Sequence, residues 1–272
     1  MTWELVELPK GKKVVDSRWV FKIKRNTSGE PVKYKARLVA QGCIQRLGVD
    51  FEEVYAPVAT QATFRTLLAV ASYKNMILKH IDIKTAYLNG RLAEEVYMRQ
   101  QPGFSKLGSE RKVCRLLKSI YGLRQTARCW NQRINEVLQK IGFTASSADP
   151  CLYIRNVNDK QVYIVVYVDD VVVGCDDEKQ VDRVHEEISR HFETTGLGEL
   201  KYFLGLQIDQ VAGKYNVCLS RYIQRVAELF GLGDAKSSRT PMDEAYARGD
   251  MLPDNANYRS LVGALLYISV NT

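Results

Sequence analysis

The strongest pattern in the chain is a pair of strand-forming runs separated by two adjacent acids. Residues 162–168 are all β-branched or aromatic, residues 171–173 are all valine, and Gly174 ends the second run. Such runs predict two buried strands joined as a hairpin. Asp169 and Asp170 stand between them, where the two charges repel each other and partial burial penalises both. A divalent cation would relieve that repulsion, and carboxylate oxygens suit Mg²⁺ or Mn²⁺.

An ordinary polar turn is the alternative interpretation of these two acids. Aspartate is common in hairpin turns because its side chain accepts hydrogen bonds from nearby backbone amides. Tight two-residue turns favour a glycine, however, and Asp169 and Asp170 are not followed by one. The spacing therefore favours the metal site over the simple turn.

A second hairpin, near the N-terminus, is predicted by apolar residues alternating with basic ones. Residues 14–25 read as a strand that alternates from Trp19 onward, residues 26–31 as a turn, and residues 32–41 as the partner strand. Cations on the exposed faces of both strands would suit a triphosphate or a template backbone. The cations are Lys22, Lys24, Lys35 and Arg37. A solvated strand surface is the alternative.

Periodicity predicts the remaining elements. Helical spacing of apolar residues is found at 61–75, 130–141, 176–192, 222–230 and 258–270, and we expect Ser220 to cap the fourth helix. Strands are predicted at 77–83, 96–98, 113–117 and 148–154, with a further hairpin of 200–208 and 215–219. Asp82 lies at the end of an apolar strand, where capping the following turn is the alternative to metal binding. The pattern is an α+β fold with a mainly antiparallel sheet.

The distribution of charge along the chain indicates a polyanionic partner. The net charge is +8, and residues 10–46 carry eleven Lys or Arg against two acids. Residues 99–133 carry nine basic residues against one acid, whereas 176–199 is acidic. Separate basic stretches are typical of a positive groove for a polyanion. A solvated basic surface is the alternative.

Other classes of site find little support. The six cysteines form no C-x-x-C pair and the three histidines are scattered, so no zinc site is predicted and reduced thiols are expected. No apolar run reaches the roughly 20 residues that span a membrane. The first residues lack a signal pattern. We therefore expect a cytosolic or nuclear protein.

Ordered blocks along the chain resemble the reverse transcriptase of copia-type retrotransposons. The most familiar is Tyr-Val-Asp-Asp at 167–170, which alone is a weak motif. The resemblance rests on blocks at 36–42, 51–58, 81–90, 96–98, 101–104, 121–125, 148–153, 167–170 and 197–205. It covers residues 14–241, with a similar tail at 258–263. So many blocks in order are highly specific.

The resemblance implies a right-hand polymerase in which an antiparallel palm sheet is covered by helices. The reverse transcriptase domain would occupy residues 1–241. Fingers would be about 1–76 and 95–130, the palm about 77–94 and 131–210, and the thumb would start at about 211–241. Residues 242–272 would form a linker and a truncated C-terminal helix.

The resemblance also implies the chemistry: RNA-directed DNA synthesis by two-metal nucleotidyl transfer, with two Mg²⁺ ions and Mn²⁺ as the alternative. It gives a catalytic and metal-binding set of Asp82, Asp169 and Asp170, joined by Ile83 as a further metal ligand. A nucleotide-binding set would be Tyr87, Gln125, Arg37, Lys35 and Lys24. Primer and template contacts would come from Tyr167, Leu204, Gly205 and Arg128. Tyr87 would act as a steric gate against ribonucleotides, and Lys201 is a weak candidate for a general acid.

Two departures from the family pattern leave a second hypothesis open. The family has Gln-Ala-Pro-Arg-x-Trp where residues 125–130 read Gln-Thr-Ala-Arg-Cys-Trp, so Ala127 replaces a proline. The protease, integrase and ribonuclease H regions of the family polyprotein are not in the 272 residues, as expected of a fragment. The alternative is thus an inactive retroelement fragment that only binds nucleic acid. An Asp-dependent phosphatase or nuclease is disfavoured, because the sequence has neither a D-x-D loop nor a His-Asp metal cluster. The expected partners are template, primer and dNTPs, with no membrane. The expected location is the cytoplasm, in a retroelement particle, or the nucleus.

Overall fold

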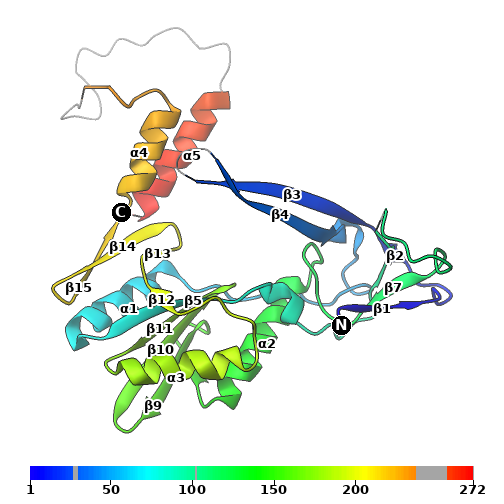
Figure 1. The fold of residues 1–272 in the computed structure, drawn as a ribbon, viewed down its shortest axis with the longest axis horizontal. Helices are drawn as coiled ribbons and strands as arrows, with labels where there is room; N and C mark the ends of the chain where they lie inside the picture. The colour runs from blue at the N-terminus through cyan, green and yellow to red at the C-terminus, as the bar shows by residue number, and fades with distance from the viewer. Residues whose placement is uncertain (27–29, 102, 237–255, 272) are drawn as a thin grey trace. The chain divides into compact units, whose positions relative to one another are not determined.

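The computed structural model describes residues 1–26, 30–101, 103–236 and 256–271. The chain divides into two compact units, Met1–Glu199 and Leu200–Thr272, each of which is described by itself (Figure 1). Helices and mainly antiparallel sheets make up both units, as the α+β pattern predicts. None of the described helices is long and apolar enough to cross a membrane.

A six-stranded sheet forms the centre of the first unit. Its order is β12-β5-β11-β10-β9-β8, and every neighbouring pair is antiparallel. The strands are β5 (Ile77–Asp82), β8 (Thr144–Ala145), β9 (Leu152–Val157), β10 (Lys160–Tyr167), β11 (Asp170–Cys175) and β12 (Gly198–Glu199). The predicted strands at 77–83 and 162–174 are confirmed. The short edge strands β8 and β12 were not predicted.

The tip of the central hairpin differs from the prediction in one respect. β10 and β11 are joined by a two-residue turn of Val168 and Asp169, and Asp170 already pairs with Tyr167 as the first residue of β11. The expectation that both acids lie between the strands was therefore wrong for Asp170. The turn ends at Asp169, one residue earlier than predicted, because the β-ladder already includes Asp170. Asp170 pairs with Tyr167 on one side and with Asp82 of β5 on the other.

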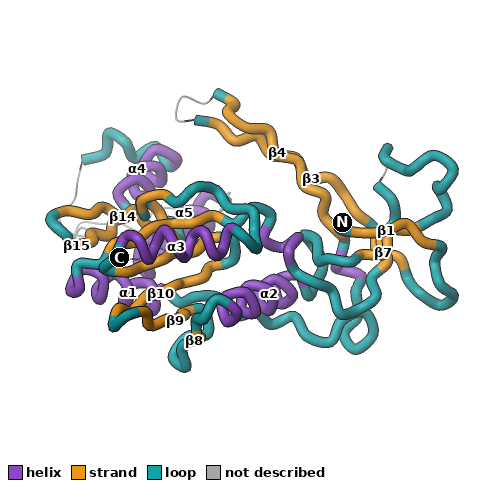
Figure 2. The backbone as a smooth tube through the Cα atoms, turned by 60° about the horizontal axis from the view of Figure 1, so that its bottom comes forward, coloured by secondary structure: helices purple, strands orange, loops and turns teal. Residues whose placement is uncertain are grey.

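Two helices cover one face of this sheet and a third contacts the other. The apolar positions of α2 (Thr126–Lys140) and α3 (Glu178–Ser189) share one buried cluster with Val171 and Val173 of β11. Both helices are drawn in purple in Figure 2. On the opposite face, a Cβ at Gly174 would lie 3.8 Å from Leu67 of α1 (Gln61–Lys74). Because side chains alternate between faces, Asp82 and Asp170 lie on this second face, further along the strands.

A second sheet and a long hairpin complete the first unit. The sheet has the order β1-β7-β6-β2, and the hairpin pairs β3 with β4. The bounds are β1 (Trp3–Val6), β2 (Val14–Val15), β3 (Ser17–Arg25), β4 (Pro31–Ala40), β6 (Tyr97–Met98) and β7 (Val113–Leu116). Short 3-10 turns lie at Gly42–Ile44 and Ala86–Asn89. The single strand predicted over 14–25 was wrong, because the chain changes sheets after Val15.

The register of the hairpin places its cations together. Lys22 is opposite Lys35, Lys24 is opposite Lys33, and Arg37 is opposite Val20. Directly paired residues share a face of an antiparallel ladder, and the face repeats every second residue. One face of the hairpin therefore carries all five of these cations.

A glycine corner holds the end of β4 in place. The Ala40 amide donates to the Tyr121 carbonyl (2.7 Å) and the Gly42 amide donates to the Gly122 carbonyl (3.1 Å). Gly122 has φ +95°, and a Cβ there would lie 2.0 Å from the Ala40 carbonyl oxygen. Both the positive φ and the close approach require glycine.

We expect Gly122→Ala to lower the free energy of unfolding by about 1–3 kcal/mol, because the backbone of β4 must move to accept the methyl group. Urea unfolding followed by circular dichroism measures this loss. Gly11→Ala is the matched control, since Gly11 has φ +80° with no atom within 4 Å of its would-be Cβ. An equal loss in both variants would show that backbone strain alone, and not the close approach, makes Gly122 necessary.

The second unit contains β13 (Tyr202–Phe203), β14 (Leu206–Val211), β15 (Lys214–Cys218), α4 (Ser220–Leu229) and α5 (Ala256–Asn271). The predicted strand 200–208 is broken by a turn at Leu204 and Gly205, which have φ +53° and +80°. The N-cap position of α4 is occupied by Leu219 and Ser220 is the first residue of the helix, so the cap prediction was wrong. The predicted last helix is confirmed as α5. Most of the predicted polar linker lies outside the described residues.

Candidate active site

Three acids lie close together in the chain's fold where β5 ends and β11 begins. Asp82 is the last residue of β5 and stands directly opposite Asp170 in the ladder. The Ile83 amide donates to the Asp169 carbonyl (2.8 Å), which ties the hairpin turn to the end of β5. The N-cap position of the following 3-10 turn is occupied by Thr85. Asp82 therefore does not serve the capping role that was its alternative.

The surroundings of Asp169 disfavour its charge. Burial raises the pKa of the Asp169 carboxyl above its usual range, and the neighbouring charges of Asp170 and Asp82 raise it further. A hydrogen bond from its own backbone and the nearby Lys35 ammonium act in the opposite direction. A divalent cation bound here would offset the repulsion, so the donor set fits the metal that the sequence predicts.

A large cavity brings two of the acids together with the basic hairpin. The cavity of about 710 Å³ is lined both by Asp82 and Asp169 and by three cations of β4. Those cations are Lys33, Lys35 and Arg37. Lys24, which was predicted to bind nucleotide, is not among the lining residues, and Lys33, which was not predicted, is.

Ile83 reaches the cavity through its main chain. Its side chain is buried in the core cluster under the sheet, yet the residue lines the cavity. The backbone of Ile83 must therefore form that part of the wall. This position is compatible with a backbone carbonyl as a metal ligand, which remains a prediction.

Asp170 is directed elsewhere. The Oδ1 atom of Asp170 lies 2.7 Å from Nε2 of His80, a residue that lies on the same face of β5 as Asp82. Asp170 does not line the cavity, and no group of three or more His, Cys, Asp or Glu side chains able to hold a metal forms within the described ranges. A site with all three carboxylates as ligands thus remains a prediction, with Asp82 and Asp169 as its better placed members.

Aromatic rings connect the basic hairpin to Tyr87. The Arg37 guanidinium lies 5.3 Å from the centre of the Tyr121 ring, and the Tyr121 ring meets Tyr87 edge-on at 5.0 Å. Burial lowers the pKa of Lys35, and the charge of Arg37 lowers it further. Tyr121 lines the cavity and was not singled out from the sequence, where it is one aromatic among many.

Tyr87 lies next to the acids without lining the large cavity. Burial raises the pKa of its hydroxyl, and the charge of Asp169 raises it further, which places the ring near the hairpin turn. Its ring lines a separate cavity of about 170 Å³ together with Val168 and Trp130. The predicted gate is therefore close to the acids, and its contact with a sugar remains a prediction.

Two other predicted site residues make structural contacts. Gln125 is fully buried, accepts a hydrogen bond from Gln45 (3.1 Å) and donates to the Asp50 carbonyl (3.4 Å). Arg128 forms an ion pair with Glu53 (3.3 Å). Neither lines the large cavity, so their predicted nucleotide and template contacts find no support in its geometry.

The remaining predicted contacts are placed as follows. Tyr167 ends β10 opposite Asp170, beside the acids. Leu204 and Gly205 form a tight turn in the second unit, where the Leu204 carbonyl accepts a hydrogen bond from the Tyr267 hydroxyl (3.1 Å). Lys201 precedes β13 and is exposed. Their roles at a primer or in acid catalysis remain predictions.

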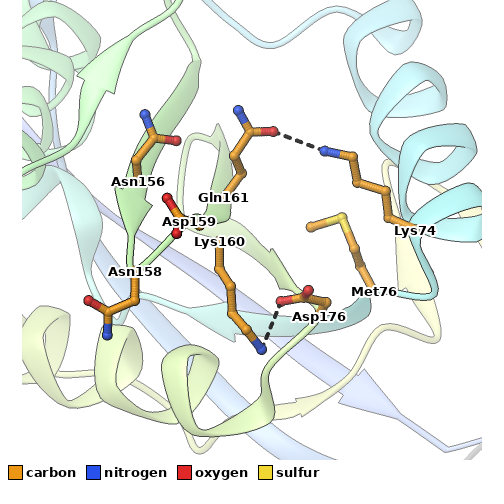
Figure 3. A pocket seen from close by; sticks show the side chains of 8 residues that line it. All are labelled: Lys74, Met76, Asn156, Asn158, Asp159, Lys160, Gln161 and Asp176. Carbon is orange, nitrogen blue, oxygen red and sulfur yellow. Dashed lines mark hydrogen bonds and ion pairs between the residues drawn. The ribbon is translucent and has the colours of Figure 1, made fainter.

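A polar pocket lies at the end of the central sheet opposite to the three acids. It is lined by residues of the β9–β10 turn together with Lys74, Met76 and Asp176. Figure 3 shows Lys74 pointing toward Gln161 and Lys160 toward Asp176, at 2.9 Å and 3.5 Å. These groups satisfy one another. The pocket provides control positions for the active site, because it lies at the opposite end of β10.

The chain is similar in sequence to known proteins. The reverse transcriptase (RNA-dependent DNA polymerase) family matches residues 1–244. A retrovirus-related Pol polyprotein from transposon TNT 1-94 of Nicotiana tabacum is 34% identical over 286 residues, with 100% of this chain and 21% of that protein covered. The corresponding polyprotein from transposon RE1 of Arabidopsis thaliana is 34% identical over 273 residues, covering 98% of this chain and 19% of that protein.

A solved foamy viral protease-reverse transcriptase in complex with double-stranded DNA is 12% identical, with a TM-score of 0.44, covering 97% of this chain and 37% of that one. The chain spans about a fifth of the length of the curated relatives that it matches.

The chain therefore belongs to the reverse transcriptase family. The match to Pol polyproteins of transposons confirms the family that the ordered sequence blocks predict.

Proposed function

We propose that this chain is the RNA-directed DNA polymerase region of a retrotransposon, which extends a primer with dNTPs by two-metal nucleotidyl transfer. The observation that carries the proposal is the shared cavity, in which Asp82 and Asp169 face Lys35 and Arg37. A nucleoside triphosphate needs both sides, since its phosphates require cations and its reacting phosphorus requires metal-binding carboxylates.

Asp82 and Asp169 would hold the divalent cations, with Asp170 and the Ile83 carbonyl as further ligands. The raised pKa of Asp169 supports this assignment, because a bound cation relieves the crowding of negative charge. Bound Mg²⁺ would lower the pKa of the primer 3′-hydroxyl and stabilise the leaving pyrophosphate. Asp170 would join through its second carboxylate oxygen, since its Oδ1 lies 2.7 Å from Nε2 of His80.

The residues of the chain itself would position the substrates. Arg37 presents a forked donor and Lys35 a point charge to the triphosphate, and both lie on the cationic face of the hairpin. The ring of Tyr121 beneath the Arg37 guanidinium limits its motion. Lys33 extends the same row and would contact the outer phosphates or the template.

The right-hand division follows from these assignments. The β3–β4 hairpin would belong to fingers that bring cations to the substrate, and the six-stranded sheet to a palm that carries the acids. The second unit would begin the thumb. Template, primer and dNTPs are the proposed partners, and the net charge of +8 supports a polyanionic one.

We expect Arg37→Ala to raise the KM for dNTP by about tenfold or more, because one forked contact between guanidinium and phosphate is lost. The salt dependence of the KM should become weaker for the same reason. Primer extension on an RNA template with Mg²⁺, measured over a range of dNTP and salt concentrations, gives both values.

Lys74→Ala is the matched control, because it removes one positive charge from the pocket of Figure 3. That pocket is roughly 23 Å from the acids, given the seven steps between the eight residues of β10 and about 3.3 Å per step. Equal KM values in Arg37→Ala and Lys74→Ala would exclude the triphosphate contact of Arg37. A solvated strand face, the alternative from the sequence, predicts that equality.

A further inference from the structure

The hairpin turn that carries Asp169 has a strained backbone. Val168, the first of its two residues, has φ +55°, and Asp169 is not among the residues with positive φ. A two-residue hairpin with positive φ at its first position is the turn type that favours glycine there. A β-branched residue in this region is a genuine outlier, and it persists only where its surroundings hold it.

Trp130 of α2 holds this turn by a hydrogen bond. Its indole Nε1 donates to the carbonyl oxygen of Val168 at 2.7 Å. The Trp130 side chain is buried, and its ring meets Phe192 edge-on at 5.1 Å. The ring that carries the donor is therefore held in place by packing.

The second anchor of the turn comes from β5. The Ile83 amide donates to the Asp169 carbonyl at 2.8 Å. The two bonds hold consecutive carbonyls of the strained turn, one from helix α2 and one from the residue that follows β5. Only the bond from Trp130 is made by a side chain, so only that one depends on the sequence at its position.

Empty space next to the turn makes the hydrogen bond from Trp130 necessary. A cavity of about 170 Å³ is lined by Val168, Trp130, Tyr87 and the side of β10 at Val166. A turn without its tether could relax toward this space, and the neighbouring Asp169 would move with it. A close-packed interior would have prevented such movement without any hydrogen bond.

We infer that Trp130 is a positioning residue that sets the orientation of the Asp169 carboxylate through the strained Val168 carbonyl. This inference rests on the proposed function, because it makes the bond a determinant of metal binding and of nucleotidyl transfer. Trp130 touches neither substrate nor metal and acts only through the turn.

Trp130→Phe tests the inference, since it keeps a large buried aromatic ring and removes the N–H donor. We expect the affinity for Mg²⁺, measured by calorimetry on the full chain with the metal alone, to fall about tenfold. The kcat for primer extension should fall by a similar factor at saturating Mg²⁺ and dNTP, with the KM for dNTP unchanged. Unchanged Mg²⁺ affinity and kcat would overturn the inference.

Tyr153→Phe is the matched control. The Tyr153 hydroxyl donates to Asn135 of α2 at 3.2 Å, so this change also deletes one buried aromatic hydrogen bond between the sheet and α2. Both variants should lower the melting temperature by about 2–4 °C, and only Trp130→Phe should lower the Mg²⁺ affinity. Equal losses of Mg²⁺ affinity in the two variants would show that Trp130 acts only through general stability.

Val168→Gly provides the rescue. Glycine adopts φ +55° without strain, so the turn no longer depends on its tether. The double variant Trp130→Phe with Val168→Gly should recover most of the lost Mg²⁺ affinity and kcat, and a failure to recover either would overturn the role of the turn. Because Mg²⁺ binding is measured without nucleic acid, a wild-type chain that binds Mg²⁺ and extends no primer would contradict the proposed function alone.

Discussion

Replacing Asp169 by Asn is expected to abolish primer extension, with a fall in rate of at least about a thousandfold. The amide keeps the shape of the side chain and loses the charge that would hold a divalent cation against the substrate. Binding of a template–primer duplex should remain nearly intact, because it depends on phosphate contacts with the basic surfaces. Extension is measured by gel and binding by fluorescence anisotropy.

The fold should not suffer from this change. The pKa of Asp169 is raised in the folded chain, so in the metal-free protein its contribution to stability is present at low pH and is lost as the pH rises through that pKa. The amide of the variant cannot ionise, so Asp169→Asn should be at least as stable as the wild type at neutral pH. The stability of the variant should also fall less as the pH rises.

Asp159→Asn is the matched control, since Asp159 lies in the turn at the other end of β10 and lines the pocket of Figure 3. Asn tolerates the positive φ of 61° at that position. We expect Asp159→Asn to extend the primer at the wild-type rate and Asp169→Asn not to extend it. That difference would locate the chemistry at the β10–β11 turn. An active Asp169→Asn protein would exclude Asp169 as a metal ligand.

Tyr87→Ala is expected to let ribonucleotides into the growing strand. Tyr87 follows the end of β5 by five residues, and its ring lies edge-on to the ring of Tyr121, which lines the large cavity. A rigid ring beneath the sugar would leave room for a 2′-hydrogen and would clash with a 2′-hydroxyl. The ratio of ribonucleotide to deoxynucleotide incorporation should rise about tenfold or more, as is usual when a pocket gains room for a small group.

A core tyrosine is the alternative, and the two roles give different results. Tyr87 packs against the main core cluster, so Tyr87→Ala in that role would lower the free energy of unfolding by about 3–5 kcal/mol without altering sugar selectivity. Tyr87→Phe is the control, because it keeps the ring and should keep the selectivity. A folded Tyr87→Ala protein with wild-type selectivity would show that the gate assignment is wrong.

Much of the fold could be predicted from local pattern. The strands of the central hairpin are buried on both faces, so their sequence is a continuous apolar run that is readily recognised. The cations of the basic hairpin alternate along each strand, and the same alternation would have added Lys33 to Lys35 and Arg37. The acids at the strand ends were also recognisable, because a charge there interrupts an apolar run.

The rest depends on pairing between distant segments. The turn includes Asp169 and excludes Asp170 because the ladder with β5 continues one residue further. The same ladder brings His80 to Asp170, a contact that no local pattern contains. Gln125 lies in a conspicuous motif but is buried and accepts a hydrogen bond from Gln45, a residue 80 positions away. Trp130 was predicted only as a core residue, since its hydrogen bond depends on the packing of α2 against the hairpin.

Addition of a single nucleotide by the wild-type chain tests the central claim most directly. The chain is mixed with Mg²⁺ and four RNA templates that differ in the base next to the primer end, and each dNTP is offered alone. We predict that only the complementary dNTP is added in each case and that chelation of Mg²⁺ stops the reaction. A folded chain that binds the template–primer and adds no nucleotide, or adds nucleotides regardless of the template base, would contradict the account.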